Sequence, residues 1–254
     1  MSISKQEALF LYLLRLADNA LILGHRLSEW SSYAPQLEED LALTNMALDL
    51  IGRSQALYKY AAEIEGKSRT GDDLVYKRAE RQFYNNLLVE QPNGDFAYTI
   101  ARQLFNVSFE ILFFEELKKS KDKTLSGIAE KTVKEVKYHL RHATDWMLRL
   151  GDGTEESHRR LQSAVDDLWM YTGELFEMDE VDAALITEGI AVDLSPLKIQ
   201  WKDSVSKVIN EATLRQPEDG YMQRGSRKGV HSEHLGFILT EMQYLQRAYP
   251  DATW

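Results

Sequence analysis

The stretch Lys134-Glu135-Val136-Lys137-Tyr138-His139-Leu140-Arg141-His142 lies within a pattern that predicts a helix over about residues 126–150. Apolar residues recur in this pattern at intervals of three and four, which places them on one face of the helix. They are Ala129, Val133, Val136, Leu140, Ala143, Met147 and Leu150. Val136 lies in the middle of that face and His139 just inside its edge, while Glu135 and His142 lie on the flank. The inward face therefore carries one histidine with a valine three residues before it.

Composition limits the classes of protein to consider. The chain has 254 residues, of which 44% are hydrophobic and 28% charged, enough for a sizeable core. A net charge of −10 argues against nucleic acid or an anionic membrane as the main partner. There is no cysteine, so disulfides, Cys-ligated zinc and iron–sulfur clusters are excluded for this chain. The N-terminus lacks a signal-peptide core and no apolar run reaches the roughly 18 residues of a membrane span, so we expect a soluble, cytoplasmic protein.

Long helical patterns separated by short stretches that contain Gly and Pro predict an all-α protein. The four longest patterns cover about residues 4–31, 37–65, 95–119 and 126–150, and a four-helix bundle packs four such helices. Shorter helices, including one over about 73–90, would lie outside this core as peripheral helices. No fixed period supports the alternative of a helical repeat protein. We therefore predict one domain over residues 1–254.

A bundle of this kind can hold a di-iron centre, which takes a Glu from each of two helices and Glu-x-x-His from each of the other two. Helix 126–150 offers His139 but has Val136 in the place of the motif's carboxylate, and helix 95–119 offers Glu110. On helix 4–31 the inward stripe contains Asn19, whereas Asp18 points away from it. At best two of the six ligands are present. The sequence therefore predicts a bundle that has lost its di-iron site, with no metal or other cofactor in this chain and His139 as a vestigial position.

The two N-terminal helical patterns differ in their inward faces. The pattern over 37–65 contains no histidine. Its spacing predicts the inward stripe Leu41, Thr44, Asn45, Leu48, Ile51, Gly52, Gln55 and Ala62. The pattern over 4–31 is apolar beyond a single stripe, because Leu14 and Ile22 lie beside that stripe. This excess predicts a contact surface for another subunit, or for a second copy when the chain is alone.

A second hypothesis is a stand-alone helical metalloenzyme. Glu135, His139 and His142 lie within about two turns of one helix and could form a mononuclear metal site if further ligands came from other elements. For His139 the simpler interpretation is a hydrogen-bonded histidine of the core. The scarcity of inward carboxylates favours a non-catalytic chain over this enzyme.

Arg78 and Arg81 are three residues apart and would share one face of the helix over 73–90. Guanidinium groups suit phosphate because they offer parallel N–H donors. A phosphorylated ligand could therefore bind here. The alternative is a solvated charged face with Glu80 as the ion partner.

The loop Arg224-Gly225-Ser226-Arg227-Lys228-Gly229 is the most basic segment of an acidic chain, and it leads to His231 and His234. Three interpretations stay open: a docking surface for a partner, a contact to phosphate, and a flexible solvated loop. Histidines three residues apart bind zinc only where further ligands are near, and the sequence shows none close by.

Blocks along the whole chain resemble a known family. They are Leu14–Asn19, Glu29–Trp30, Asp40–Leu43, Leu48–Leu50, Glu80–Phe83, Val89–Gly94, Thr99–Gln103, Gly229–Gly236 and Glu241–Arg247. Together they are similar to the structural, non-catalytic subunits of bacterial ring-1,2-phenylacetyl-CoA epoxidases, the multicomponent oxygenases of aerobic phenylacetate catabolism. The last two blocks are the most specific.

The resemblance implies a ferritin-like fold without a di-iron centre, paired in a hetero-oligomer with a homologous catalytic subunit that keeps the di-iron centre. It also implies other subunits, a reductase component with NADPH, flavin and an iron–sulfur cluster, and phenylacetyl-CoA as substrate. The chain would belong to an oxygenase complex without carrying the catalytic centre itself. The resemblance associates two stretches with the CoA ester: Arg78, Ala79, Glu80 and Arg81, and Asp179, Glu180 and Val181. For Asp179 the alternative is a helix N-cap.

Overall fold

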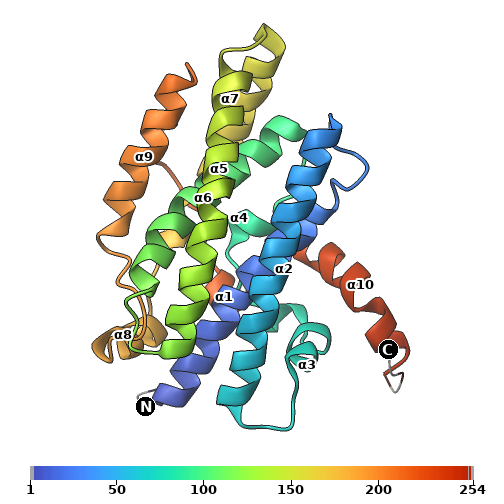
Figure 1. The fold of residues 1–254 in the computed structure, drawn as a ribbon, viewed down its shortest axis with the longest axis vertical. Coiled ribbons are helices and arrows are strands. Elements are labelled where there is room, and N and C mark those ends of the chain that lie inside the picture. The colour runs from blue at the N-terminus through green and yellow to red at the C-terminus, as the bar shows by residue number, and fades with distance from the viewer. Residues whose placement is uncertain (1–2, 251, 253–254) are drawn as a thin grey trace.

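The computed structural model describes residues 3–250 and residue 252, and every regular element among them is a helix (Figure 1). The long helices are α1 (Lys5–Ser28), α2 (Leu37–Glu65), α5 (Phe96–Leu117) and α6 (Lys123–Gly151). The shorter elements are α3 (Gly71–Tyr76), η1 (Glu80–Gln82), α4 (Leu87–Glu90), α7 (Glu155–Trp169), η2 (Gly173–Phe176), α8 (Glu180–Thr187), α9 (Leu197–Glu211), η3 (Ser226–Lys228) and α10 (Glu233–Ala248). The prediction of an all-α fold is confirmed.

Side-chain caps set the ends of the long helices. The hydroxyl of Ser4 and the carboxylates of Asp95 and Asp122 each accept a hydrogen bond from the backbone N–H three residues later, at 2.9–3.2 Å. Gly66 ends α2 in the left-handed conformation, with φ of 68°. Because Asp122 caps α6, that helix begins at Lys123, a few residues before the predicted start.

The four long helices form a ferritin-like bundle. Helix α1 packs along α2, α5 packs along α6, and contact between α2 and α6 joins the two pairs. Helices α7 and α9 cover α5, and α8 lies against α1. Helix α10 contacts α3 and η1 and lies on the opposite side of the molecule from α9 (Figure 1). The bundle therefore has a covered side at α5 and a more open side at α2.

Aromatic side chains fix the covering helices to α5. The ring of Phe105 lies 5.6 Å from Trp169 of α7 and 6.1 Å from Trp201 of α9, measured between ring centroids. The indole N–H of Trp201 donates to the backbone carbonyl of Phe105 at 2.9 Å. Helix α5 is consequently buried on most sides, as its continuous apolar sequence predicts.

The predicted helix over 73–90 is wrong. This segment forms α3, η1 and α4, with extended backbone at Phe83 and Asn86 between them. Polar groups of α1 take up the backbone donors that a helix would have used: Asp18 accepts from the N–H of Tyr84 at 2.8 Å, and Asn19 accepts from the N–H of Asn86 at 2.7 Å. Tertiary contacts have therefore overridden the local helical pattern.

Two expectations for α1 are also wrong. Asp18 is fully buried, although the pattern places it outside the inward stripe. Its carboxylate accepts from the Tyr58 hydroxyl and pairs with the Arg78 guanidinium. Leu14 and Ile22 are 3% and 0% exposed, so the apolar excess of α1 is covered within this chain. Leu14 and Ile22 are therefore not available to contact a second subunit.

The inward face predicted for α2 is wrong in register. Leu41 and Leu48 are 57% and 60% exposed, whereas Leu43, Leu50 and Leu57 are at most 1% exposed. Helix α2 therefore has two apolar faces, one in the core and one on the surface. Spacing alone cannot tell which of two such faces is turned inward.

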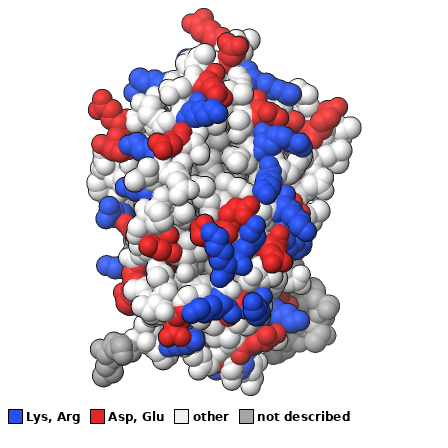
Figure 2. All heavy atoms as spheres, turned by 60° about the vertical axis from the view of Figure 1, so that its left-hand side comes forward, with Lys and Arg blue, Asp and Glu red and all other residues white. Residues whose placement is uncertain are grey.

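Charged side chains of both signs are interspersed on the face shown in Figure 2, with uncharged surface between them. The acidic net charge is therefore not gathered into one patch on this face. Helix α1 is long and apolar enough to cross a membrane by length and composition, but 72% of its most apolar window is buried inside the protein. Burial of this kind is what a core helix of a bundle shows.

Candidate functional site

An open groove of about 860 Å³ runs between the N-terminal half of α1, the start of α8 and the turn at η3. Its lining residues are Ile3, Glu7, Leu11, Arg15, Tyr84, Glu177, Met178, Asp179, Glu180, Val181, Arg224, Arg227 and Lys228. The stretches 179–181 and 224–228, which the sequence singles out separately, thus meet on one surface. We take this groove as the candidate functional site.

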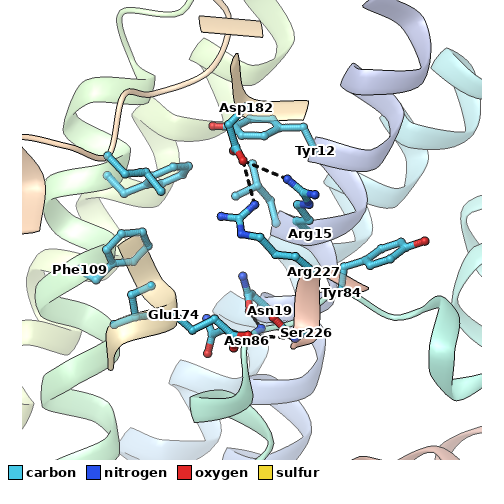
Figure 3. A pocket seen from close by; sticks show the side chains of 14 residues that line it. Tyr12, Arg15, Asn19, Tyr84, Asn86, Phe109, Glu174, Asp182, Ser226 and Arg227 are labelled. Carbon is cyan, nitrogen blue, oxygen red and sulfur yellow. Dashed lines mark hydrogen bonds and ion pairs between the residues drawn. The ribbon is translucent and has the colours of Figure 1, made fainter. Parts of the chain in front are cut away.

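A small cavity of about 50 Å³, lined by both polar and apolar side chains, adjoins the groove (Figure 3). Arg15, Tyr84 and Arg227 line both spaces. Asn19, Asn86 and Glu174 line only the inner cavity, opposite the ring of Phe109. A space of this size holds a few water molecules and no larger ligand.

A network of ion pairs separates the cavity from the groove. The guanidinium of Arg15 donates to Asp179 at 2.5 and 3.0 Å. Asp182 accepts from Arg15 at 3.1 Å and from Arg227 at 3.0 Å (Figure 3). Partial burial opposes ionisation of Asp179, but the hydrogen bond and charge of Arg15 lower the pKa of Asp179 to about 2. Asp179 is therefore ionised at neutral pH, whereas burial raises the pKa of Asp182 despite the charges of Arg227 and Arg15 beside it.

Glu174 fixes the basic loop on the other side of the cavity. Its buried carboxylate accepts from the N–H groups of Gly225 at 2.8 Å, Ser226 at 2.9 Å and Leu87 at 2.9 Å. Gly229 adopts a φ of 67°, and an added Cβ there would lie 2.1 Å from the carbonyl oxygen of Arg81. The loop is thus held by specific contacts, and the interpretation as a flexible solvated loop is wrong.

The rim of the groove carries the basic side chains of that loop. Arg224 pairs with Glu177 at 3.0 Å, and Arg227 is bound by Asp182. Lys228 and Arg81 are exposed, and neither forms an ion pair with another residue in the described part of the chain. Lys228 lines the groove, whereas Arg81 lies beside it, with its backbone against Gly229.

The four residues from Arg78 to Arg81 lie in different environments in the structure. Arg78 is 4% exposed, pairs with Asp18, and its guanidinium carbon lies 4.0 Å from the centroid of the Phe83 ring. The prediction that Arg78 and Arg81 share a helix face is therefore wrong. Ala79 and Glu80 are exposed and line a separate groove against α10.

Asp179, Glu180 and Val181 lie together at the start of α8. Asp179 accepts from the N–H of Val181 at 3.0 Å and caps the helix, so the N-cap interpretation holds alongside its place in the groove. Glu180 is exposed and Val181 is 2% exposed. Only the acidic pair of this stretch can therefore present polar side-chain atoms to a ligand.

His231 is enclosed, and its side chain has no exposed surface. Its Nδ1 lies 2.9 Å from a carboxylate oxygen of Glu90, and its Nε2 lies 2.8 Å from the carbonyl oxygen of Phe83. Burial alone would lower its pKa, but the hydrogen bond and charge of Glu90 outweigh burial and raise the pKa of His231. His231 therefore cannot reach a partner, a phosphate or a zinc ion, whereas His234 is only half-buried.

The bundle interior does not fit a di-iron centre. Glu110 of α5 pairs with the guanidinium of Arg53 of α2 at 3.1 Å, so the protein itself supplies a cation at this carboxylate. Val136 is fully buried, and His139 lies 3.1 Å from the carboxylate of Asp49. In this donor set an arginine neutralises Glu110, and Val136 stands three residues before His139, where the Glu-x-x-His motif has its carboxylate.

The alternative site of Glu135, His139 and His142 is not assembled. His139 and His142 face different carboxylates of α2, those of Asp49 and Glu39, and the distance from His142 to Glu39 is 2.7 Å. Glu135 pairs instead with Lys131 at 3.3 Å. The structure therefore gives no geometric support to a mononuclear centre at these three residues.

Comparison with known proteins gives the chain its family. The model of a family described as phenylacetic acid catabolic protein matches residues 1–254. The chain belongs to this family. It is also 50% identical over 243 residues to a subunit of the 1,2-phenylacetyl-CoA epoxidase of Escherichia coli (strain K12), a match that spans 96% of this chain and 98% of that relative. The family resemblance inferred from the sequence blocks is confirmed.

Sequence reasoning did not find Arg15, Glu174 or Asp182 of the site. Arg15 is a charged residue in an apolar helix, which is the one local sign that it has a buried partner. That partner lies 164 residues further along the chain in the case of Asp179. No spacing rule reaches across such a distance.

Proposed function

We propose that this chain is the non-catalytic structural subunit of a multicomponent phenylacetyl-CoA epoxidase. The observation that carries the proposal is 50% identity, over 96% of the chain, to a protein named as one subunit of that enzyme. The bundle interior supports it, because Arg53 neutralises Glu110 and Val136 stands where the Glu-x-x-His motif has its carboxylate. The chain would act in the cytoplasm, and its role would be assembly and binding.

In this proposal the chain stabilises a homologous catalytic subunit that carries the di-iron centre. Electrons would come from a reductase component with NADPH, flavin and an iron–sulfur cluster. Glu110 cannot serve as a metal ligand while Arg53 neutralises it, since both side chains are buried and paired. The oxidation of the aromatic ring is therefore assigned to the partner.

Co-expression of this chain with the catalytic subunit of the same organism, with an affinity tag on the catalytic subunit only, tests the assembly. We expect the untagged chain to copurify in a fixed ratio, and we expect epoxidation with the reductase only when both chains are present. Full activity and solubility of the catalytic subunit without this chain would contradict the proposal.

We propose that the groove contributes to binding of the CoA ester. Coenzyme A carries several phosphates, and Arg81 and Lys228 supply cations that are exposed and have no ion partner within the described residues. Asp179 and Glu180 supply acceptors for amide or amine N–H groups of the ligand. Arg78 is left out of this contact because its ion pair with buried Asp18 would have to open.

Single replacements of Arg81 and Lys228 by alanine, made in the assembled complex, test the CoA contact. A charge-assisted contact contributes about 1.5–3 kcal/mol, so each variant should bind a CoA ester at least about ten-fold more weakly. Lys207→Ala on α9 is the matched control, because this side chain is 75% exposed and lies outside the groove. Unchanged affinity in both the Arg81 and the Lys228 variant, with the complex intact, would exclude the contact.

A further inference from the structure

The sequence contains one Asn-Gly pair, Asn93-Gly94, and it lies in the turn between α4 and α5. Asparagine is a chemically labile residue, and a following glycine increases the lability because it has no Cβ to shield its backbone nitrogen from the asparagine side chain. Gly94 is exposed and Asn93 is half-buried, so solvent water reaches the pair. The pair does not line the candidate groove.

The geometry of the turn requires the glycine. Gly94 adopts a φ of 57°, in the left-handed region that other residues rarely occupy. An added Cβ at Gly94 would lie 3.0 Å from Cβ and Cγ of Tyr98 on the first turn of α5. The turn therefore keeps a glycine at this position, even though the glycine makes the preceding asparagine labile.

Three residues hold the side-chain amide of Asn93. Its Nδ2 donates to the backbone carbonyl oxygen of Arg26 at 2.6 Å and to Oε2 of Glu29 at 2.9 Å. Its Oδ1 accepts from Nη2 of Arg102 at 2.6 Å, and the side chain of Arg102 is fully buried. We call Arg26, Glu29 and Arg102 the Asn93 clamp. The clamp fixes the amide from the end of α1 on one side and from α5 on the other.

Deamidation of this pair needs water and no other reactant. The backbone nitrogen of Gly94 loses its proton to solvent and attacks Cγ of Asn93. A bond forms between this nitrogen and Cγ, the bond between Cγ and Nδ2 breaks, and Nδ2 leaves as ammonia. Water then opens the succinimide ring at one of its two carbonyls, which gives aspartate or isoaspartate. Because Cγ becomes tetrahedral as the ring closes, Nδ2 and Oδ1 must move out of the planar arrangement that the clamp holds.

We propose that Asn93 is a deamidation site and that the Asn93 clamp controls its rate. Modification proceeds when the junction of α1, α4 and α5 opens locally and releases the amide. This inference goes beyond the proposed function, because it involves neither the catalytic subunit nor the CoA ester.

The aspartate product weakens the junction that released it. The new carboxylate keeps Oδ1 for Arg102, but an oxygen replaces the donor Nδ2. That oxygen faces the carbonyl oxygen of Arg26 and the carboxylate of Glu29, so acceptors meet with no donor between them. The charge of Arg102 offsets only part of this cost. A chain that has opened here once is thereby marked, and it opens more easily afterwards.

Incubation of the purified full chain at mildly alkaline pH, in buffer and in urea, tests the control by the fold. Peptide mapping by mass spectrometry measures the rate at each asparagine. Because the native amide must give up the hydrogen bonds of the clamp, Asn93 should deamidate at least about ten-fold more slowly in buffer than in urea. In urea Asn93 should react faster than Asn210, which precedes Glu211. Equal rates in buffer and in urea, or a slower reaction of Asn93 than of Asn210 in urea, would overturn the proposal.

Glu29→Ala tests the clamp in the folded chain. The side chain of Glu29 is 42% exposed, so the variant should fold, and the loss of one acceptor for Nδ2 should raise the native rate at Asn93 several-fold. Glu116→Ala on α5 is the matched control, since this side chain is 44% exposed and pairs with Lys119. A native rate that Glu29→Ala leaves unchanged would refute the role of the clamp.

Asn93→Asp tests the effect of the product. This variant should unfold at a lower urea concentration than the wild type. Glu29→Gln in the same chain should restore part of the loss, because a glutamine amide can donate to the new carboxylate. A single variant as stable as the wild type, or a double variant less stable than Asn93→Asp, would contradict the predicted weakening.

Discussion

Replacement of His231 by alanine should unfold the protein at markedly lower denaturant concentration. The imidazole and its partner Glu90 have no exposed side-chain surface, so the variant leaves a buried carboxylate without its cation. Removal of one member of a buried ion pair costs about 3–5 kcal/mol. The N–H of Ser232 still donates to Glu90 at 2.6 Å in the variant, which places the expected loss at about 3 kcal/mol, the lower end of that range.

The loss of folding free energy caused by His231→Ala should depend on pH. Both ring nitrogens of His231 face acceptors, a carboxylate oxygen and a carbonyl oxygen, so the doubly protonated ring is the form that satisfies both. Its pKa in the folded protein is raised above the ordinary value of 6.5. The stabilisation is therefore complete below about pH 6.5 and is lost as the pH rises through the raised folded value. The difference in stability between wild type and variant should therefore shrink as the pH is raised above about 6.5.

Urea unfolding followed by circular dichroism, in a pH series that rises from about pH 6, measures both effects. His234→Ala is the control, because this half-buried residue should change stability by no more than about 0.5 kcal/mol at either end of the series. A His231→Ala variant as stable as the wild type at the lower pH would refute the buried ion pair. A loss that stays the same at the higher pH would refute the assignment of the charged ring.

The remaining predictions concern residues for which the structure shows contacts or burial that the sequence did not predict. Arg78→Ala should lower the free energy of unfolding by about 3–5 kcal/mol in a urea titration, because it leaves the carboxylate of Asp18 buried and unpaired. Arg53→Met alone should be destabilising to a similar degree, while Arg53→Met with Glu110→Leu should recover most of that loss in the same assay, since both charges are then removed. Leu14→Glu should lower the melting temperature and not merely change the oligomeric state, because this side chain is 3% exposed.

The long helices were predictable because two independent signals agree on them. Apolar spacing gives their extent, and side chains such as Asp95 and Asp122 give their starts. The segment 73–90 was not predictable in the same way. The segment does have helical spacing, but Asp18 and Asn19 of α1 accept hydrogen bonds from its backbone N–H groups. The local sequence contains no signal for these contacts with a distant helix.

Helix α2 shows a different limit. Leu41 and Leu48 follow a helical spacing as regular as that of Leu43, Leu50 and Leu57, and the sequence offers two faces of similar quality. Which face enters the core depends on how the helix is rotated against α1 and α6, and rotation is a property of the assembled bundle. The sequence therefore identified the face with Leu41 and Leu48 correctly as apolar but assigned it wrongly to the core.

For the candidate site, the sequence identified the pieces but not their arrangement. The stretches 179–181 and 224–228 were recognised by charge and by family resemblance, and the structure brings them together in one groove. The ion pair between Arg227 and Asp182 that joins them spans 45 positions. Arg81 was grouped with Arg78 by spacing, whereas backbone contact with Gly229 places it beside the basic loop.

The ion pairs of Arg15 have a consequence for synthesis of the chain. The carboxylates that receive its guanidinium lie 164 and 167 residues further along. A ribosome adds about 5–20 residues per second, so about 8–33 s pass between the emergence of Arg15 and that of Asp179. During this interval the side of α1 that carries Arg15 has no covering helix and must stay in water or on a chaperone. The N-terminal helix, although made first, is thus among the last to be fully enclosed.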